Sequence, residues 1–360
     1  MPRTLLTTAT VSVVWPVCLL ACTLVSCLPT TQQGKSPRRE AVDYINGRGG
    51  KVIYFTGDTV LGPGVEGRCL VEWQEVQLTA QDMAMLLRLK DDVFSLDLRR
   101  CQIPEQSFPN FKNFGQVQRL DLSFTNAGDE AASAIQGHRQ LSKLTMYGCP
   151  ITDRGVRDLA NLQNLSELYL NGTQVTDIAM KYVAKLSRLA WFDIGNTASF
   201  TGRHLGLLPA TVTKLEVRAK TQSEVLQYLE GNTNLRELRV YFNGSDRGLV
   251  SLRKIPNLEE LNLSSTGTTD EGLRHVGTLR HLQVLKLANT KITDQGLAHL
   301  SGLKELKRLH LERTQLASNG ILQLRDLQKL DYLGLRDTTV SRDVRAEFHR
   351  HNPRVSFGVR

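Results

Sequence analysis

A glycine-rich run near the amino terminus has the spacing of a nucleotide-binding motif. Residues 62–67 match GxGxxG, which binds a dinucleotide where a strand leads into the turn and a helix follows it. Here Pro63 stiffens the turn, and residues 68–78 have an extended pattern instead of a helical one. We therefore interpret the run as a hairpin-like loop and expect no bound cofactor.

Other patterns of catalytic or metal-binding residues are missing from the sequence. It contains no HExxH, GxSxG or CxxC motif, and its eight histidines are dispersed. His349 and His351 have a spacing of two, which points their side chains apart on a helix. These observations argue against an enzyme and against a zinc site.

The remaining candidates for chemistry are aromatic and charged side chains, which act by noncovalent binding. Tyr147, Tyr169 and Trp191 fall in three successive copies of a repeat, and Tyr, Trp and Arg dominate binding hot spots. The candidate partner-binding set consists of Tyr147, Tyr169, Trp191, Asp193, Arg218, Arg239 and Tyr241. Whether these residues lie together depends on the elements that carry them.

Those elements are copies of one unit, which is clearest in residues 282–300. A short strand carries Leu285 and Leu287 on one face, a turn follows at Thr290, and a helix begins at Thr293. Eleven copies recur at steps of 23 or 24 residues, which predicts a repeat array. The paired strand positions are Leu96/Leu98, Leu120/Leu122, Leu144/Met146, Leu168/Leu170, Phe192/Ile194, Leu215/Val217, Leu238/Val240, Leu261/Leu263, Leu285/Leu287, Leu309/Leu311 and Leu333/Leu335.

Two further columns follow the same register. The turn position carries Thr or Cys, and a hydroxyl or thiol there can bond backbone groups of the turn. A Thr-Asp pair recurs at helix starts, where either residue can cap the helix and the Asp charge suits its dipole. We assign structural roles to both columns.

The pattern LxxLxLxx(T/C)x(I/V/L)TDxGL resembles the leucine-rich-repeat superfamily, especially its cysteine-containing subclass and exported bacterial proteins with TDxGL-type repeats. The resemblance covers about residues 70–357. It implies an α/β fold, a curved leucine-rich-repeat solenoid with parallel strands concave and helices convex, and binding instead of catalysis. Thr or Cys replaces the usual Asn of the family, and Lys220 and Asn243 stand where the turn column is lost.

The chain divides into five predicted segments. Residues 1–27 are a signal or anchor, 28–40 a polar linker, 41–92 an amino-terminal cap, 93–343 the repeats and 344–360 a carboxy-terminal cap. Caps are expected because an open solenoid end exposes core.

The amino-terminal segment has the pattern of an export signal. Arg3 precedes a stretch, residues 5–28, without Asp, Glu, Lys or Arg. Leu24-Val25-Ser26-Cys27 resembles a bacterial lipobox, which predicts lipidation of Cys27; a match ending at Cys22 is poorer. An uncleaved anchor and a plain cleaved signal remain alternatives. All three predict an extracytoplasmic body, in the lipoprotein case anchored in the cell envelope.

The cysteines of the body are not expected to form bridges. Cys101 and Cys149 occupy the same position two repeats apart, so their strands lie ~10 Å from each other, beyond the reach of a disulfide. Cys69 has no obvious partner. We predict that Cys101 and Cys149 are small buried thiols.

The net charge of +9 does not predict a nucleic-acid partner. The predicted concave face carries nine Lys or Arg and eight Asp or Glu, whereas a nucleic-acid groove needs clustered positive charge. We expect a protein partner, bound around the aromatic residues. Scattered surface aromatics without a partner, a carbohydrate or cell-wall ligand, and an F-box-type adaptor are the alternatives; the export signal argues against the last.

Overall fold

The computed structural model describes residues 35–359 apart from 57–58, 62–66, 198, 219–222, 243–245 and 318. For residues 56, 59–61 and 223 it describes the backbone only. Cys27, the predicted signal, most of the GxGxxG run, Lys220 and Asn243 lie outside the described residues. Residues 37–360 form one compact unit.

The amino-terminal part of this unit begins with α1 (Pro37–Gly47), which starts inside the predicted linker. Strand β1 (Lys51–Thr56) pairs antiparallel with β2 (Thr59–Leu61) and with β3 (Arg68–Glu72). Helix α2 (Ala80–Leu87) follows, capped by Thr79. Asp82 is fully buried and accepts hydrogen bonds from Tyr44 and Arg48, which ties α2 to α1.

Each predicted repeat supplies one strand of the described sheet. The strands are β4 (Val93–Asp97), β5 (Arg119–Asp121), β6 (Lys143–Thr145), β7 (Glu167–Tyr169), β8 (Trp191–Gly195), β9 (Lys214–Arg218), β10 (Glu237–Tyr241), β11 (Glu260–Asn262), β12 (Val284–Lys286), β13 (Arg308–His310) and β14 (Tyr332–Gly334). The predicted register is confirmed, because residues at the same repeat position pair between neighbouring strands. Leu215, for example, pairs with Leu238, and Leu238 pairs with Leu261.

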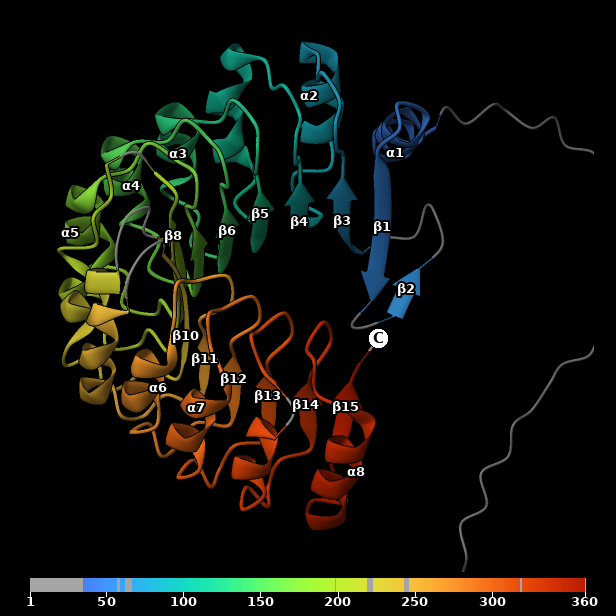
Figure 1. Cartoon of the computed structure of the whole chain (residues 1–360). Coiled ribbons are helices and arrows are strands. Elements are labelled where there is room, and N and C mark those ends of the chain that lie inside the picture. Colours follow the sequence, from blue (N-terminus) through green and yellow to red (C-terminus); the bar gives the residue numbers. More distant parts are fainter. Residues whose placement is uncertain are drawn as a thin grey trace, which may run out of the picture. The chain divides into compact units, whose positions relative to one another are not determined.

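The return segments are short α-helices and 3₁₀ helices. They are η1 (Glu105–Asn113), α3 (Asp129–Ile135), α4 (Asp153–Leu159), η2 (Asp177–Ala179), α5 (Met180–Val183), η3 (Leu205–Leu207), η4 (Ser223–Leu229), η5 (Arg247–Lys254), α6 (Asp270–Val276), α7 (Asp294–Leu297), η6 (Ala298–Leu300) and η7 (Gly320–Leu324). In Figure 1 the strands form a curved sheet along the inner side of the array, and these helical segments lie along its outer side. The predicted solenoid architecture is confirmed.

The sheet order among the described residues runs from β15 through β14 down to β3, then β1 and β2, and the strands from β3 to β15 are parallel. Strands β8, β9 and β10 each have five residues, whereas most others in the array have three. The longer pairing keeps Gly195, Arg218 and Tyr241 in register at the ends of these three strands.

The turn after each strand explains the Thr column. The residue before the Thr or Cys has a positive φ in most repeats, and these residues are Arg100, Phe124, Gly148, Gly172, Asn196, Ser265, Asn289, Arg313 and Asp337. The Thr hydroxyl then donates to the carbonyl three residues earlier, at 2.6 Å in Thr125 and 2.7 Å in Thr290. The Sγ of Cys149 instead donates to the carbonyl of Leu122 in the preceding repeat, at 2.9 Å.

The Thr-Asp pairs act differently from a simple helix cap. Thr152, Thr176 and Thr293 cap their own helices, as predicted. Each Asp, however, accepts hydrogen bonds from the following repeat: Asp153 binds the backbone N and Oγ1 of Thr176 at 2.8 and 2.6 Å. The motif therefore joins one repeat to the next.

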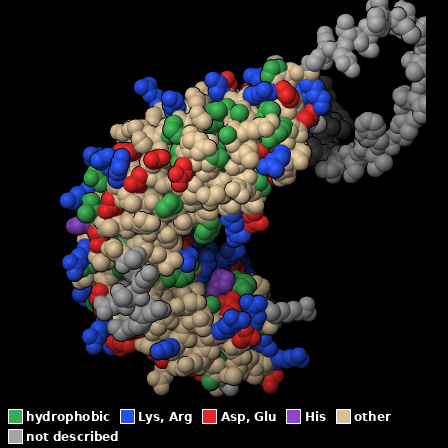
Figure 2. Space-filling model, turned by 90° about the horizontal axis from the view of Figure 1, so that it is seen from above, with side chains coloured by type: hydrophobic (Ala, Val, Ile, Leu, Met, Phe, Trp, Pro, Cys, Tyr) green, Lys and Arg blue, Asp and Glu red, His purple; other side chains and the backbone are tan. Residues whose placement is uncertain are grey.

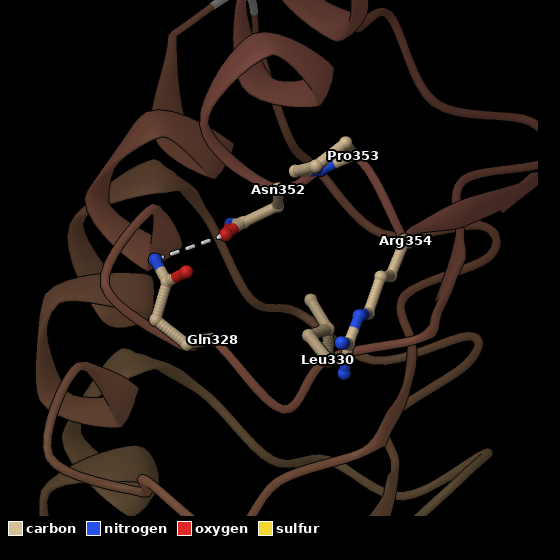
Figure 3. Close-up of a pocket in the computed structure, with 5 residues that line it drawn as sticks. All are labelled: Gln328, Leu330, Asn352, Pro353 and Arg354. Carbon is tan, nitrogen blue, oxygen red and sulfur yellow. Dashed lines mark hydrogen bonds between the residues drawn. The ribbon is translucent and has the colours of Figure 1, made fainter.

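Helix α8 (Arg342–His351), capped by Ser341, and β15 (Ser356–Gly358) close the array. Beside them a cavity of 330 Å³ is lined by Gln328, Leu330, Asn352, Pro353 and Arg354. Figure 3 shows the amide of Gln328 directed at Asn352, whose Nδ2 donates to the carbonyl of Arg325 at 3.1 Å. These amides connect the last helix to the repeat before it.

Candidate partner-binding surface

The three aromatic residues predicted to lie together do so. The ring centroids of Tyr147 and Tyr169 are 5.7 Å apart and those of Tyr169 and Trp191 are 5.4 Å apart. They come from the turn after β6, the end of β7 and the start of β8. Their diagonal contact follows from parallel strands that keep one register.

Tyr169 is buried, although the sequence predicted that it would be exposed. Only 6% of it is accessible, and its hydroxyl donates to Glu167 Oε2 at 2.8 Å. The rings of Tyr147 and Trp191 flank it, and the Lys143 Nζ lies 4.9 Å from its ring centroid. Tyr169 therefore supports its neighbours instead of offering a contact surface.

Asp193, also expected on the surface, is 2% exposed. It accepts a hydrogen bond of 2.5 Å from the Tyr147 hydroxyl and one of 3.4 Å from Asn171 Nδ2. Burial, the largest cause, and the nearby Glu216 carboxylate together raise the pKa of Asp193 to about 6, although the hydrogen bond from Tyr147 opposes the shift. Asp193 thus holds the Tyr147 side chain in place through the hydrogen bond to its hydroxyl.

Glu216 is a site residue that the sequence prediction missed. It is buried on β9, and its Oε1 accepts from Arg218 Nη2 at 2.7 Å while its Oε2 lies 3.7 Å from Arg239 Nη1. Its position in the middle of a strand between two predicted members was the available indication. Burial of the Arg218 guanidinium lowers its pKa, but the hydrogen bond and the charge of Glu216 raise it, and the net shift of the Arg218 pKa is upward.

Both guanidinium groups also lie over aromatic rings. Arg218 is 4.4 Å from the Tyr241 ring centroid and Arg239 is 5.8 Å from that of Trp191. The side chain of Arg218 is nonetheless 44% exposed. The arrangement therefore offers fixed cations and partly exposed aromatic faces, and its chemistry is noncovalent recognition.

Phe124 is a second residue that sequence reasoning missed. It is 59% exposed and has a φ of 58°, a conformation unfavourable for a bulky side chain. Its backbone N donates to the carbonyl of Tyr147 at 2.6 Å, so it borders the cluster. Its ring lies against Gly148, where an added Cβ would stand 2.7 Å from Cδ1. In the other repeats that keep the Thr or Cys column, the residue before that Thr or Cys is Gly, Asn, Ser, Asp or Arg, so a Phe at this position was the indication in the sequence.

The charges around these elements are mixed. Figure 2 shows acidic and basic side chains intermingled over the face it displays. Among the described residues, no group of three His, Cys, Asp or Glu side chains could hold a metal ion. No helix in the described part of the chain is long and apolar enough to cross a membrane.

The comparisons with known proteins agree with this fold. A leucine-rich-repeat family model matches residues 254–275 and 278–301. These two matched segments and the structural likeness described next show the leucine-rich-repeat solenoid fold. A search of curated protein sequences finds no match.

Two internalins of Listeria monocytogenes are similar in structure. The crystal structure of internalin inlF has a TM-score of 0.56 at 16% sequence identity, over 89% of this chain and 94% of that one. Internalin C2 has a TM-score of 0.37 at 21% identity, over 63% of this chain and 83% of that one. The first likeness establishes the fold alone.

Proposed function

We propose that this protein binds another protein through the concave surface of β6 to β10. The observation that carries the proposal is the pair Arg218 and Arg239, held by one buried carboxylate, Glu216, and stacked on Tyr241 and Trp191. Arg, Tyr and Trp are the residue types enriched at binding hot spots. Because their geometry is set before binding, little ordering entropy is lost on association.

The proposal includes a location outside the cytoplasm. Its support is the apolar stretch of residues 5–28 and the lipobox-like sequence ending at Cys27. Metabolic labelling with a fatty-acid analogue is expected to mark the wild-type chain and not Cys27→Ala. Equal labelling of both would contradict lipidation at Cys27.

A carbohydrate ligand remains the second candidate, but the burial of Tyr169 counts against it. Three consecutive stacking platforms were its basis, and only Tyr147 and Trp191 retain partial exposure. Binding to isolated cell wall, compared with binding to extracted envelope proteins, separates the two.

Crosslinking to an envelope extract tests the protein contact. We expect the double variant Trp191→Ala/Arg239→Ala to recover at least about tenfold less of a specific partner, because two hot-spot side chains each contribute more than 1 kcal/mol. The control is Arg308→Ala/Tyr332→Ala, which removes an Arg and an aromatic residue from β13 and β14. Equal recovery by the two double variants, with melting temperatures matching wild type, would overturn the proposal.

A further inference from the structure

A pocket of 150 Å³ lies on the concave side of β3 to β6, next to the aromatic cluster. Its walls follow two rows of strand residues: Leu70, Ser95, Arg119 and Lys143 in one row, and Glu72, Asp97, Asp121 and Thr145 in the other. The first row is basic at one end and the second is mainly acidic. One wall of the pocket therefore carries positive charge and the opposite wall carries negative charge.

Some of these charges are neutralised within the protein. Asp97 accepts hydrogen bonds from Arg99, and Asp121 accepts from the backbone N and hydroxyl of Ser123. Lys143 forms an ion pair with Glu167 at 2.8 Å. These groups have their partners already and do not by themselves require a ligand.

Other polar groups in the pocket form no hydrogen bond or ion pair with a described residue. Neither Arg119 nor Glu72 forms a hydrogen bond or ion pair there through its side chain, and the hydroxyls of Ser95 and Thr145 are likewise unpaired. Thr145 lines the pocket and is 6% exposed as a whole residue. Unpaired donors and one unpaired acceptor therefore converge on the same pocket.

Arg119 and Glu72 have opposite charges but lie on strands that are not neighbours. Strand β4 separates β3 from β5, so the two backbones are ~10 Å apart. A ligand that bridges them needs a cationic group for Glu72 and an anionic group for Arg119. A carboxylate suits the guanidinium fork, and an ammonium suits the carboxylate.

The size of the pocket limits the ligand. A protein cavity of about 150 Å³ holds a molecule with roughly six non-hydrogen atoms, such as benzene. A small α-amino acid has that size and carries both charges. We propose that this pocket binds a small zwitterion of the free amino-acid class, with its carboxylate at Arg119, its ammonium at Glu72 and hydroxyl contacts from Ser95 and Thr145.

The test is titration of the full chain with L-alanine, followed by calorimetry and saturation-transfer NMR. Propionate and ethylamine, which each carry one of the two charges, serve as comparison probes. We expect saturable alanine binding with a Kd on the order of 1 mM, and at least tenfold weaker binding of the other two. No saturable alanine binding, or propionate binding as tight as that of alanine, would overturn the assignment.

Substitutions locate the site. Arg119→Gln and Glu72→Gln should each weaken alanine binding at least tenfold, and Thr145→Val by a smaller factor. We expect no loss of folding, because neither charged side chain forms a hydrogen bond or ion pair with a described residue. Arg308→Gln is the matched control, since Arg308 occupies the Arg119 position on β13. Equal binding by Arg119→Gln and Arg308→Gln contradicts the proposal.

A charge exchange adds a further check. In Glu72→Lys/Arg119→Glu the two charges trade places, so alanine can bind in the reverse orientation. We expect this double variant to bind alanine at least threefold more tightly than either charge reversal alone. Binding no better than that of the single reversals would show that the two charges do not act on one ligand.

Discussion

The carboxylate of Asp270 occupies the space that a Cβ on Gly296 would need. Asp270 belongs to one repeat and Gly296 to the next, where Asp270 also accepts from Thr293 N at 2.8 Å and Thr293 Oγ1 at 2.5 Å. The same relationship joins Asp129 with Gly155 and Asp246 with Gly272. The glycine of the TDxGL motif is thus required by the aspartate of the preceding repeat.

This relationship predicts a steric penalty at Gly296. Gly296→Ala should lower the free energy of unfolding by about 1–3 kcal/mol, the usual cost of overpacking. Gly137→Ala is the control, because no atom lies within 4 Å of an added Cβ there; it should be neutral or slightly stabilising. Urea denaturation measures both, and equal stabilities would contradict the packing argument.

The hydrogen bonds of Asp270 should matter as well. Asp270→Ala leaves two partly buried donors of Thr293 without their acceptor, which costs about 1–3 kcal/mol. It also removes the obstacle to a side chain at residue 296. The double variant Asp270→Ala/Gly296→Ala should therefore be less destabilised than the sum of the single variants. Strict additivity in urea denaturation would show that the two residues do not interact.

The raised pKa of Asp193 predicts that the stability of the fold depends on pH. Its pKa is about 6 in the folded protein and ~3.9 in an unfolded chain, so between these values the folded state holds the proton more tightly. Stability from this group is therefore lost as pH rises from about 4 to 6, by roughly 2–3 kcal/mol.

Asp193→Asn cannot titrate and should be free of this contribution. Relative to wild type, it should gain stability between pH 4.5 and pH 7.5, as measured by urea denaturation at both values. A constant difference between the two proteins across that range would contradict the raised pKa of Asp193.

Phe124 predicts opposite effects on stability and binding. Phe124→Gly removes the unfavourable left-handed conformation of a bulky residue and should stabilise the fold by about 1 kcal/mol. If Phe124 extends the partner contact, the same variant should recover less of the crosslinked partner. Thermal unfolding and crosslinking on one preparation measure both effects; a destabilised variant would show that the exposed ring supports the fold.

The three body cysteines should resist alkylation. All are free and buried, and burial raises the pKa of Cys69 to about 12 and that of Cys101 and Cys149 above the usual value. Because the thiolate is the reactive form, iodoacetamide at pH 8 should label these residues only after denaturation. Peptide mapping by mass spectrometry resolves each site; rapid labelling of the native protein would contradict their burial.

The periodic spacing of Leu and Thr was enough to predict the strands, their register and the hydroxyl column. Stacked repeats bury the same position each time, so local periodicity and tertiary burial coincide. The proximity of Tyr147, Tyr169 and Trp191 followed from the same register. These predictions succeeded because each depends only on which repeat position a residue occupies.

Tyr169, Asp193 and Glu216 show where that reasoning ended. Strand alternation places all three on the concave side, but whether such a residue is exposed depends on the neighbours that lean over it from adjacent strands. The aspartate of the TDxGL motif likewise appeared to be a local cap, while its partners lie in the next repeat.

The sequence by itself determined the solenoid, because its spacing repeats what every strand and turn requires. Only the tertiary structure decided which polar residues are satisfied inside the protein and which remain available. Glu216 is neutralised by Arg218 and Arg239, whereas Glu72 and Arg119 are kept apart by β4. The physical reason is that charge pairing depends on distances between side chains from different strands, and these distances arise only when the repeats stack.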